Sequence, residues 1–186
     1  MSLNKILSLA ASTIKSTILF LLIFLNSNIS SEEMTQYNPD DQGVLSIMYH
    51  RFEENKYPST NIRMNIFIEH IAAIKNNGFE FYNPKLFNEQ FNEPKENKKI
   101  LLTIDDAFLS FYENAWPILK KNEIPFILFV STEPIGKRGY MTWEQIKEIE
   151  KEKFAFIGNH SHTHEYLIKF SFSDFKSDIN ESIKIF

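Results

Sequence analysis

The sequence contains no cysteine among its 186 residues. Disulfide bonds and thiol chemistry are therefore excluded, and the folded protein must be held together by packing alone. The sequence also lacks a sustained basic run, because its 20 lysines and arginines are scattered along a chain whose formal net charge is −4. Nucleic-acid-binding proteins gather basic residues on one face, so nucleic acid is not expected as a partner.

Residues 1–30 differ in character from the rest of the chain. Lys5 and Lys15 precede an uninterrupted apolar run over residues 17–25. This pattern is typical of an export signal, and the run is shorter than the roughly 20 residues that a membrane-spanning helix needs. We expect either a cleaved signal peptide or an N-terminal anchor, which would be the only contact with a membrane. The protein is then exported, to the periplasm or the extracellular space.

After a polar linker, residues 31–43, short apolar runs alternate with amphipathic stretches over residues 44–186. Strands are predicted at Val44–Tyr49, Phe79–Tyr82, Ile100–Ile104, Phe126–Val130 and Phe154–Ile157, and helices over 65–77, 111–121, 143–151 and 173–186. Phe175, Ile179 and Ile183 supply one face of the last helix. Such alternation is typical of α/β proteins with a parallel sheet, either open or part of a barrel, in which functional residues gather at the carboxyl ends of the strands.

Two local signals concern helix starts. Thr142 and Gln145 have the spacing of a capping box, which predicts that a helix begins at Trp143. Pro117 falls inside the predicted helix over 111–121, so it must either open a shorter helix or kink a longer one.

Two adjacent carboxylates, Asp105 and Asp106, directly follow the most apolar predicted strand. Adjacent carboxylates repel each other unless something neutralises one of them, and a bound cation is a common remedy. An Asx turn leading into the next loop would explain the pair equally well. The pair alone therefore leaves a cation site and a structural turn as alternatives.

A second cluster, His160-Ser-His-Thr-His164, follows the last predicted strand and holds three of the five histidines. Histidines four residues apart project from one face of a helical turn, so both imidazoles can reach one ion, although exposed helices also produce this spacing by chance. Together with one aspartate they make a ligand set that leaves coordination positions open. Open positions favour a catalytic site over a structural one.

The residues around both clusters resemble the polysaccharide deacetylases with a NodB homology domain, carbohydrate esterase family 4. Residues 102–107, Leu-Thr-Ile-Asp-Asp-Ala, are similar to the family's Thr-Phe-Asp-Asp-Gly motif. Residues 157–164, followed by Leu167, are similar to its His-Ser/Thr-x-x-His motif, and Met48-Tyr-His-Arg-Phe52 resembles the Tyr-His-x-Phe start of one branch. The resemblance runs over residues 44–186 and implies an α/β fold, part of a distorted barrel of strand-helix units, (β/α)7 in type.

The resemblance implies a metal-dependent hydrolase that removes N-linked or O-linked acetyl groups from a polysaccharide or amino-sugar glycan. Asp106, His160 and His164 would bind the metal, and Asp105 would be the general base that takes a proton from the attacking water. Zinc is the expected metal, and cobalt, nickel or iron would fit the same ligands. The expected partner is an N-acetylated glycan substrate.

The chain departs from the family pattern in two ways. Ala107 and Glu165 stand where the family has glycine and proline, and neither the Arg-x-Pro-Tyr segment nor the Leu-x-x-His motif that supplies a general acid is found. We therefore expect residues 44–186 to be a domain truncated at its C-terminus. An inactive carbohydrate-binding relative that keeps the metal site, and an exported interaction protein with incidental clusters, remain as alternatives.

The remaining histidines have simpler interpretations. His162 lies between the two expected ligands and should point away from them. His70 lies in an amphipathic helix and is expected to be solvated, whereas His50 follows a strand end and could line the site.

Overall fold

The computed structural model describes residues 44–87 and 98–186. All of these residues belong to one compact unit. The predicted export signal and linker, residues 1–43, lie outside the described residues and stay predictions. Within the described ranges, none of the helices has the length and apolar character that crossing a membrane requires.

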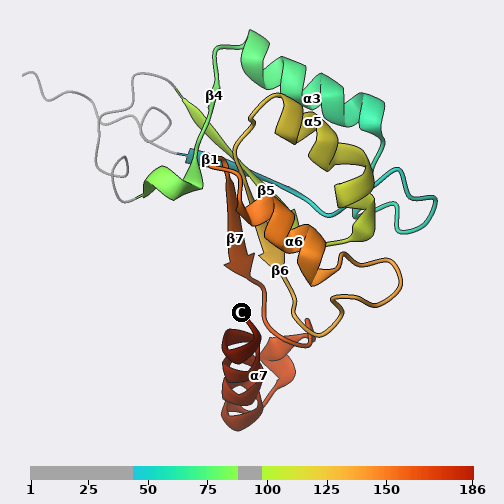
Figure 1. Cartoon of the computed structure of the whole chain (residues 1–186), viewed down its shortest axis with the longest axis vertical. Helices are drawn as coiled ribbons and strands as arrows, with labels where there is room; N and C mark the ends of the chain where they lie inside the picture. Colours follow the sequence, from blue (N-terminus) through green and yellow to red (C-terminus); the bar gives the residue numbers. More distant parts are fainter. Residues whose placement is uncertain (1–43, 88–97) are drawn as a thin grey trace, which may run out of the picture. The chain divides into compact units, whose positions relative to one another are not determined.

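A parallel sheet lies at the centre of the fold (Figure 1). Strands β1 (Val44–Tyr49), β5 (Lys99–Asp105), β6 (Phe126–Val130) and β7 (Ala155–Asn159) follow one another across it, and β4 (Glu80–Phe81) pairs with the first residues of β5. Every pair in this sheet is parallel. The α/β class predicted from the alternating pattern is confirmed.

Four α-helices accompany the strands in the described part of the chain: α3 (Met64–Asn76), α5 (Trp116–Lys121), α6 (Trp143–Glu150) and α7 (Phe172–Ile185). The shorter elements are β2 (Arg51–Phe52), β3 (Asn61–Ile62), η1 (Pro84–Leu86), η2 (Phe111–Ala115) and η3 (Leu167–Lys169). Helix α7 lies beyond the carboxyl ends of β6 and β7 (Figure 1). The capping box at the start of α6 is confirmed, because the Thr142 hydroxyl accepts from Gln145 N while the Gln145 side chain accepts from Thr142 N.

The predicted helix over 111–121 is two elements. Residues Phe111–Ala115 form a π-helical turn, and the α-helix begins at Trp116 with Pro117 in its first turn. Proline has no amide hydrogen to donate, so it is tolerated where an α-helix starts and not in its interior. Pro117 therefore opens a shorter helix, which was one of the two predicted alternatives.

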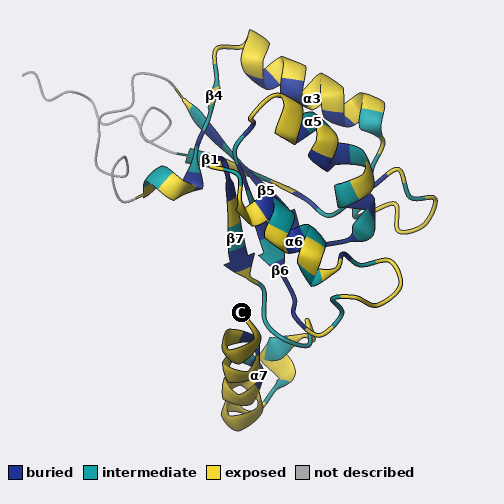
Figure 2. Ribbon diagram, viewed as in Figure 1, coloured by how far each residue is buried: buried dark blue, intermediate teal, exposed yellow. Residues whose placement is uncertain are grey.

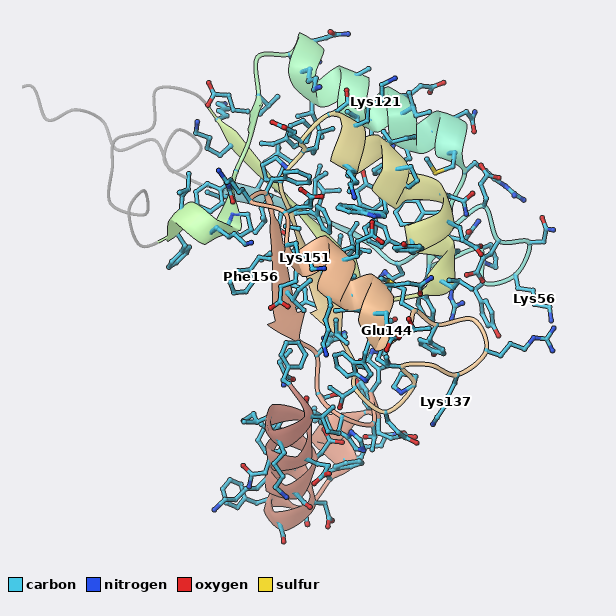
Figure 3. The ribbon with its side chains drawn as sticks, viewed as in Figure 1. Lys56, Lys121, Lys137, Glu144, Lys151 and Phe156 are labelled. Carbon is cyan, nitrogen blue, oxygen red and sulfur yellow. The ribbon has the colours of Figure 1, made fainter. Side chains whose placement is uncertain are left out.

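The hydrophobic core fills the space between the sheet and its helices. Strands β5 and β6 contribute Leu102, Ile104, Phe126 and Leu128, all fully buried. Helix α3 adds Phe67, Ile71 and Ile74 to the same core, and Phe67 is fully buried. Figure 2 shows buried residues along β5 and β6 and the exposed outer faces of the helices, and Figure 3 shows Lys56 and Lys137 at the periphery.

Helix α7 forms as predicted, but its apolar face is not buried. Phe175 is 40% exposed and Ile183 is 61% exposed. The buried side chains of this helix are instead Asp178 and Ser182. A helix that buries two polar residues must satisfy their hydrogen bonds, and both face the loop that carries the paired histidines.

Candidate active site

The two adjacent carboxylates lie where β5 ends. Asp105 is the last residue of the strand, and Asp106 and Ala107 follow in the left-handed conformation with φ of 71° and 53°. Met141 N donates to Ala107 O at 3.0 Å, and Leu109 N donates to Gly139 O at 2.9 Å, so the loop before α6 holds the turn. The turn fixes both carboxylates in buried positions, 7% and 6% exposed.

The paired histidines lie in an irregular loop directly after β7. The expectation that they share a helical turn is wrong, because Ser161 and His164 have φ of 69° and 57°, which a right-handed helix does not allow. The rings nevertheless meet, with 5.0 Å between the centroids of His160 and His164. The two imidazoles therefore lie side by side, as their spacing predicted, although the backbone between them is not helical.

A ladder of hydrogen bonds beyond β6 supports one side of this loop. His160 N donates to Val130 O at 2.9 Å, Thr132 N donates to Ser161 O at 3.2 Å, and Glu133 N donates to His162 O at 3.0 Å. The parallel pairing of β6 with β7 thus continues past the ends of both strands. Hydrogen bonds from residues distant in sequence therefore fix the conformation of this loop.

The four predicted site residues converge at the carboxyl ends of β5 and β7. His164 Nε2 lies 3.0 Å and His160 Nε2 lies 3.5 Å from Asp106 Oδ1. One ligand atom from each of these residues falls within 4.8 Å of the others, which is close enough for all three to bind one ion. Asp106 Oδ1 is buried and has no hydrogen-bond partner among the described residues. A buried carboxylate oxygen is costly to leave unpaired, so this arrangement fits a bound cation.

Asp105 lies between two imidazoles. Its Oδ2 atom is 4.0 Å from Nε2 of His160 and 4.0 Å from Nε2 of His50. Burial raises the pKa of Asp105, and the neighbouring His160 and His50 oppose that rise, while the Asp106 carboxylate adds to it. Asp105 is thus a partly desolvated carboxylate beside the cluster of Asp106, His160 and His164.

A cavity of about 460 Å³ opens beside the histidine pair. Its lining residues come from the loop and from α7: Asn159, His160, Ser161, His164, Glu165, Tyr166, Leu167 and Ile179. Apolar and polar side chains both contribute to this lining, as they do in pockets that bind small molecules.

Of the other three histidines, His162 and His70 lie outside the site and His50 lies in it, as the sequence suggested. His162 turns to Thr132, with Nδ1 2.8 Å from the threonine Oγ1, and stays outside the ligand cluster. His70 is exposed on α3, with Nδ1 3.0 Å from the Tyr49 hydroxyl. His50 lines the site. Asp178, which holds the loop from the other side, was missed, because an aspartate on an amphipathic helix gives no signal that it is buried.

Comparison with known proteins finds relatives among the polysaccharide deacetylases. The polysaccharide deacetylase family matches residues 92–186. YxkH of Bacillus subtilis, which is named for the same family, is 29% identical over 143 residues, 75% of this chain and 50% of that protein. The poly-beta-1,6-N-acetyl-D-glucosamine N-deacetylase of Escherichia coli is 22% identical over 179 residues, 80% of this chain and 27% of that protein.

A solved structure shares the fold. IcaB from Ammonifex degensii superimposes with a TM-score of 0.67 at 25% identity, over 77% of this chain and 68% of that one. The fold and site define an α/β protein with an aspartate-histidine cluster at the carboxyl edge of a parallel sheet. The chain belongs to the polysaccharide deacetylase family. It spans half or less of the length of the two curated relatives.

Proposed function

We propose that the protein is a metal-dependent hydrolase that removes acetyl groups from a polymer of N-acetylglucosamine. The observation that carries this proposal is the meeting of Asp106, His160 and His164 around one point, with Asp105 beside them. Family membership and the named activities of relatives such as the Escherichia coli protein support the reaction and the substrate class.

Asp106, His160 and His164 would hold the metal, and zinc suits two imidazoles and a carboxylate, as would cobalt, nickel or iron. A bound divalent ion would lower the pKa of water and polarise the acetyl carbonyl. Asp105 takes a proton from the water that attacks the acetyl carbon, since it is the carboxylate outside the ligand cluster.

We propose that His50 is the general acid that protonates the leaving amine. Cleavage of the carbon–nitrogen bond releases acetate and an amine, and the amine must gain a proton. His50 lies 4.0 Å from Asp105 Oδ2 and is not one of the ligand cluster, so its imidazole is free to carry that proton. In the family pattern the acid comes from a later Leu-x-x-His motif, so this role of His50 is a proposal of its own.

We further propose that residues 1–30 direct export, since a glycan substrate of this kind lies outside the cytoplasm. A catalytically inactive glycan-binding relative is the alternative. It would keep the same ligand cluster without turnover.

The test is release of primary amine from β-1,6-linked N-acetylglucosamine oligomers, with zinc, cobalt, nickel or iron supplied in separate assays. Wild type should release amine, Asp105→Asn should not, and Asp174→Asn should match wild type because Asp174 is exposed on α7. Glycan binding without amine release by wild type would favour the inactive relative. No binding and no release with any of the four metals would overturn the proposal.

A further inference from the structure

Helix α7 attaches to the rest of the fold in an unusual way for an amphipathic helix. Helices at a protein surface bury an apolar stripe and expose their polar residues. In α7 the two buried side chains are Asp178, 6% exposed, and Ser182, 0% exposed. Besides the ring contact of Phe186 with Trp143 at the end of the chain, the position of this helix therefore depends on the hydrogen bonds of these two residues.

The carboxylate of Asp178 accepts three hydrogen bonds from the loop between the paired histidines. His162 N donates to Oδ2 at 2.9 Å, and Thr163 donates to Oδ1 from its amide at 2.9 Å and from its hydroxyl at 2.6 Å. Burial alone would raise the pKa of this carboxyl, but the Thr163 hydroxyl and the two amides outweigh it and lower the pKa. Bonds to a charged acceptor are stronger than neutral ones.

Ser182 lies one helical turn further along and faces the same way. Its hydroxyl donates to Ser161 O at 3.1 Å. The two α7 residues thus bind Ser161, His162 and Thr163, which are the residues between the expected metal ligands. The residues after β6 bind the same loop from its other side.

We propose that Asp178 is a positioning residue of the metal site, which holds the loop so that the imidazoles of His160 and His164 meet at Asp106. The inference rests on the proposed metal site. The loop needs such support because Ser161 and His164 both adopt the left-handed conformation, which costs free energy in residues other than glycine. Asp178 offsets that cost without touching the metal.

Metal affinity of the folded protein distinguishes a positioning role of Asp178 from a merely structural one. If the carboxylate only docks α7, its loss weakens folding but leaves the metal site intact once the chain is folded. If it positions the ligands, its loss weakens metal affinity in the folded protein. Outer residues that orient metal ligands commonly change metal affinity by about 10–100-fold when they are replaced.

The experiment is a cobalt and a zinc titration of the full chain, read by calorimetry and by the visible spectrum of cobalt. Asp178→Ala should raise the dissociation constant by about 10–100-fold and alter the cobalt spectrum, and Asp178→Asn should do so by less, because it keeps an acceptor oxygen. Glu181→Gln, an exposed neighbour on the same helix, should bind as wild type does. Circular dichroism shows which variants are folded. If Asp178→Ala does not fold, the metal affinity of Asp178→Asn is the test of the positioning role.

Each outcome has a distinct meaning. Folded Asp178 variants that bind cobalt with wild-type affinity and spectrum would overturn the positioning role while leaving the proposed function in place. A wild type that binds neither metal would overturn the metal site, and the positioning role with it.

Discussion

The Nε2 atom of His50 and the Oδ2 atom of Asp105 lie 4.0 Å apart, although 55 positions separate them in the sequence. The register of β1 on β5 places Tyr49 beside Ile104, so His50, which follows β1, and Asp105, the last residue of β5, fall at the same edge of the sheet. His160 approaches the same oxygen at 4.0 Å from β7. Asp105 is thereby flanked by one imidazole of the ligand cluster and one outside it.

Replacing Asp105 by asparagine should abolish turnover and leave metal binding in place. The amide keeps the size of the carboxylate but cannot take a proton, and general-base catalysis is worth about 10²–10⁴-fold in rate. Turnover is followed by amine release, and metal content by elemental analysis. A variant that keeps wild-type turnover would remove Asp105 from its proposed role.

Replacing His50 by glutamine should lower turnover by about 10²-fold or more while metal affinity stays unchanged, because the leaving amine loses its proton donor. His70→Gln is the matched control, since His70 is an exposed histidine on α3. Comparable losses in both variants would mean that His50 acts only through the fold. An unchanged rate for His50→Gln would show that another group supplies the proton.

Replacing Gly158 by alanine should destabilise the sheet next to the site. A Cβ atom at this position would lie 2.6 Å from Cδ1 of Phe129 and 3.3 Å from Cγ2 of Ile127. Overpacking of this kind costs about 1–3 kcal/mol of unfolding free energy, measurable by urea denaturation. Adding Phe129→Leu should restore part of the loss. Wild-type stability of Gly158→Ala alone would contradict the close packing of β6 on β7.

The stabilising contribution of Asp178 should disappear in acid. Its pKa is lowered from 3.8 in the folded protein, so the unfolded chain binds the proton more readily. The contribution is present above the unfolded value of 3.8 and is lost as the pH falls through the lower folded value. The difference in unfolding free energy between wild type and Asp178→Asn should therefore be constant at mildly acidic pH and shrink below 3.8. A difference that does not change with pH would mean that the carboxylate is not bonded in its charged form.

The sequence predicted the features that local patterns determine. Continuous apolar runs located the strands, and the residues directly after two of them, Asp106 and His160, had to meet at one edge of a parallel sheet. The loop conformation could not be predicted, since it depends on Thr132 and Asp178, which are distant in sequence from the residues that they bind. Periodicity likewise gave a helix at the C-terminal end but could not reveal that it buries polar residues instead of Phe175.

The metal content of wild type and Asp106→Ala tests the central claim most directly. Each purified protein is loaded with zinc, freed of excess ion and analysed for bound metal, with Asp174→Ala as a control on an exposed aspartate. Asp106 supplies the buried oxygen that both imidazoles approach, so its replacement removes one of the three expected ligands and leaves two histidines. Wild type and the control should retain a stoichiometric ion, and Asp106→Ala should lose it. Equal metal content in wild type and Asp106→Ala, whether full or absent, would contradict the account.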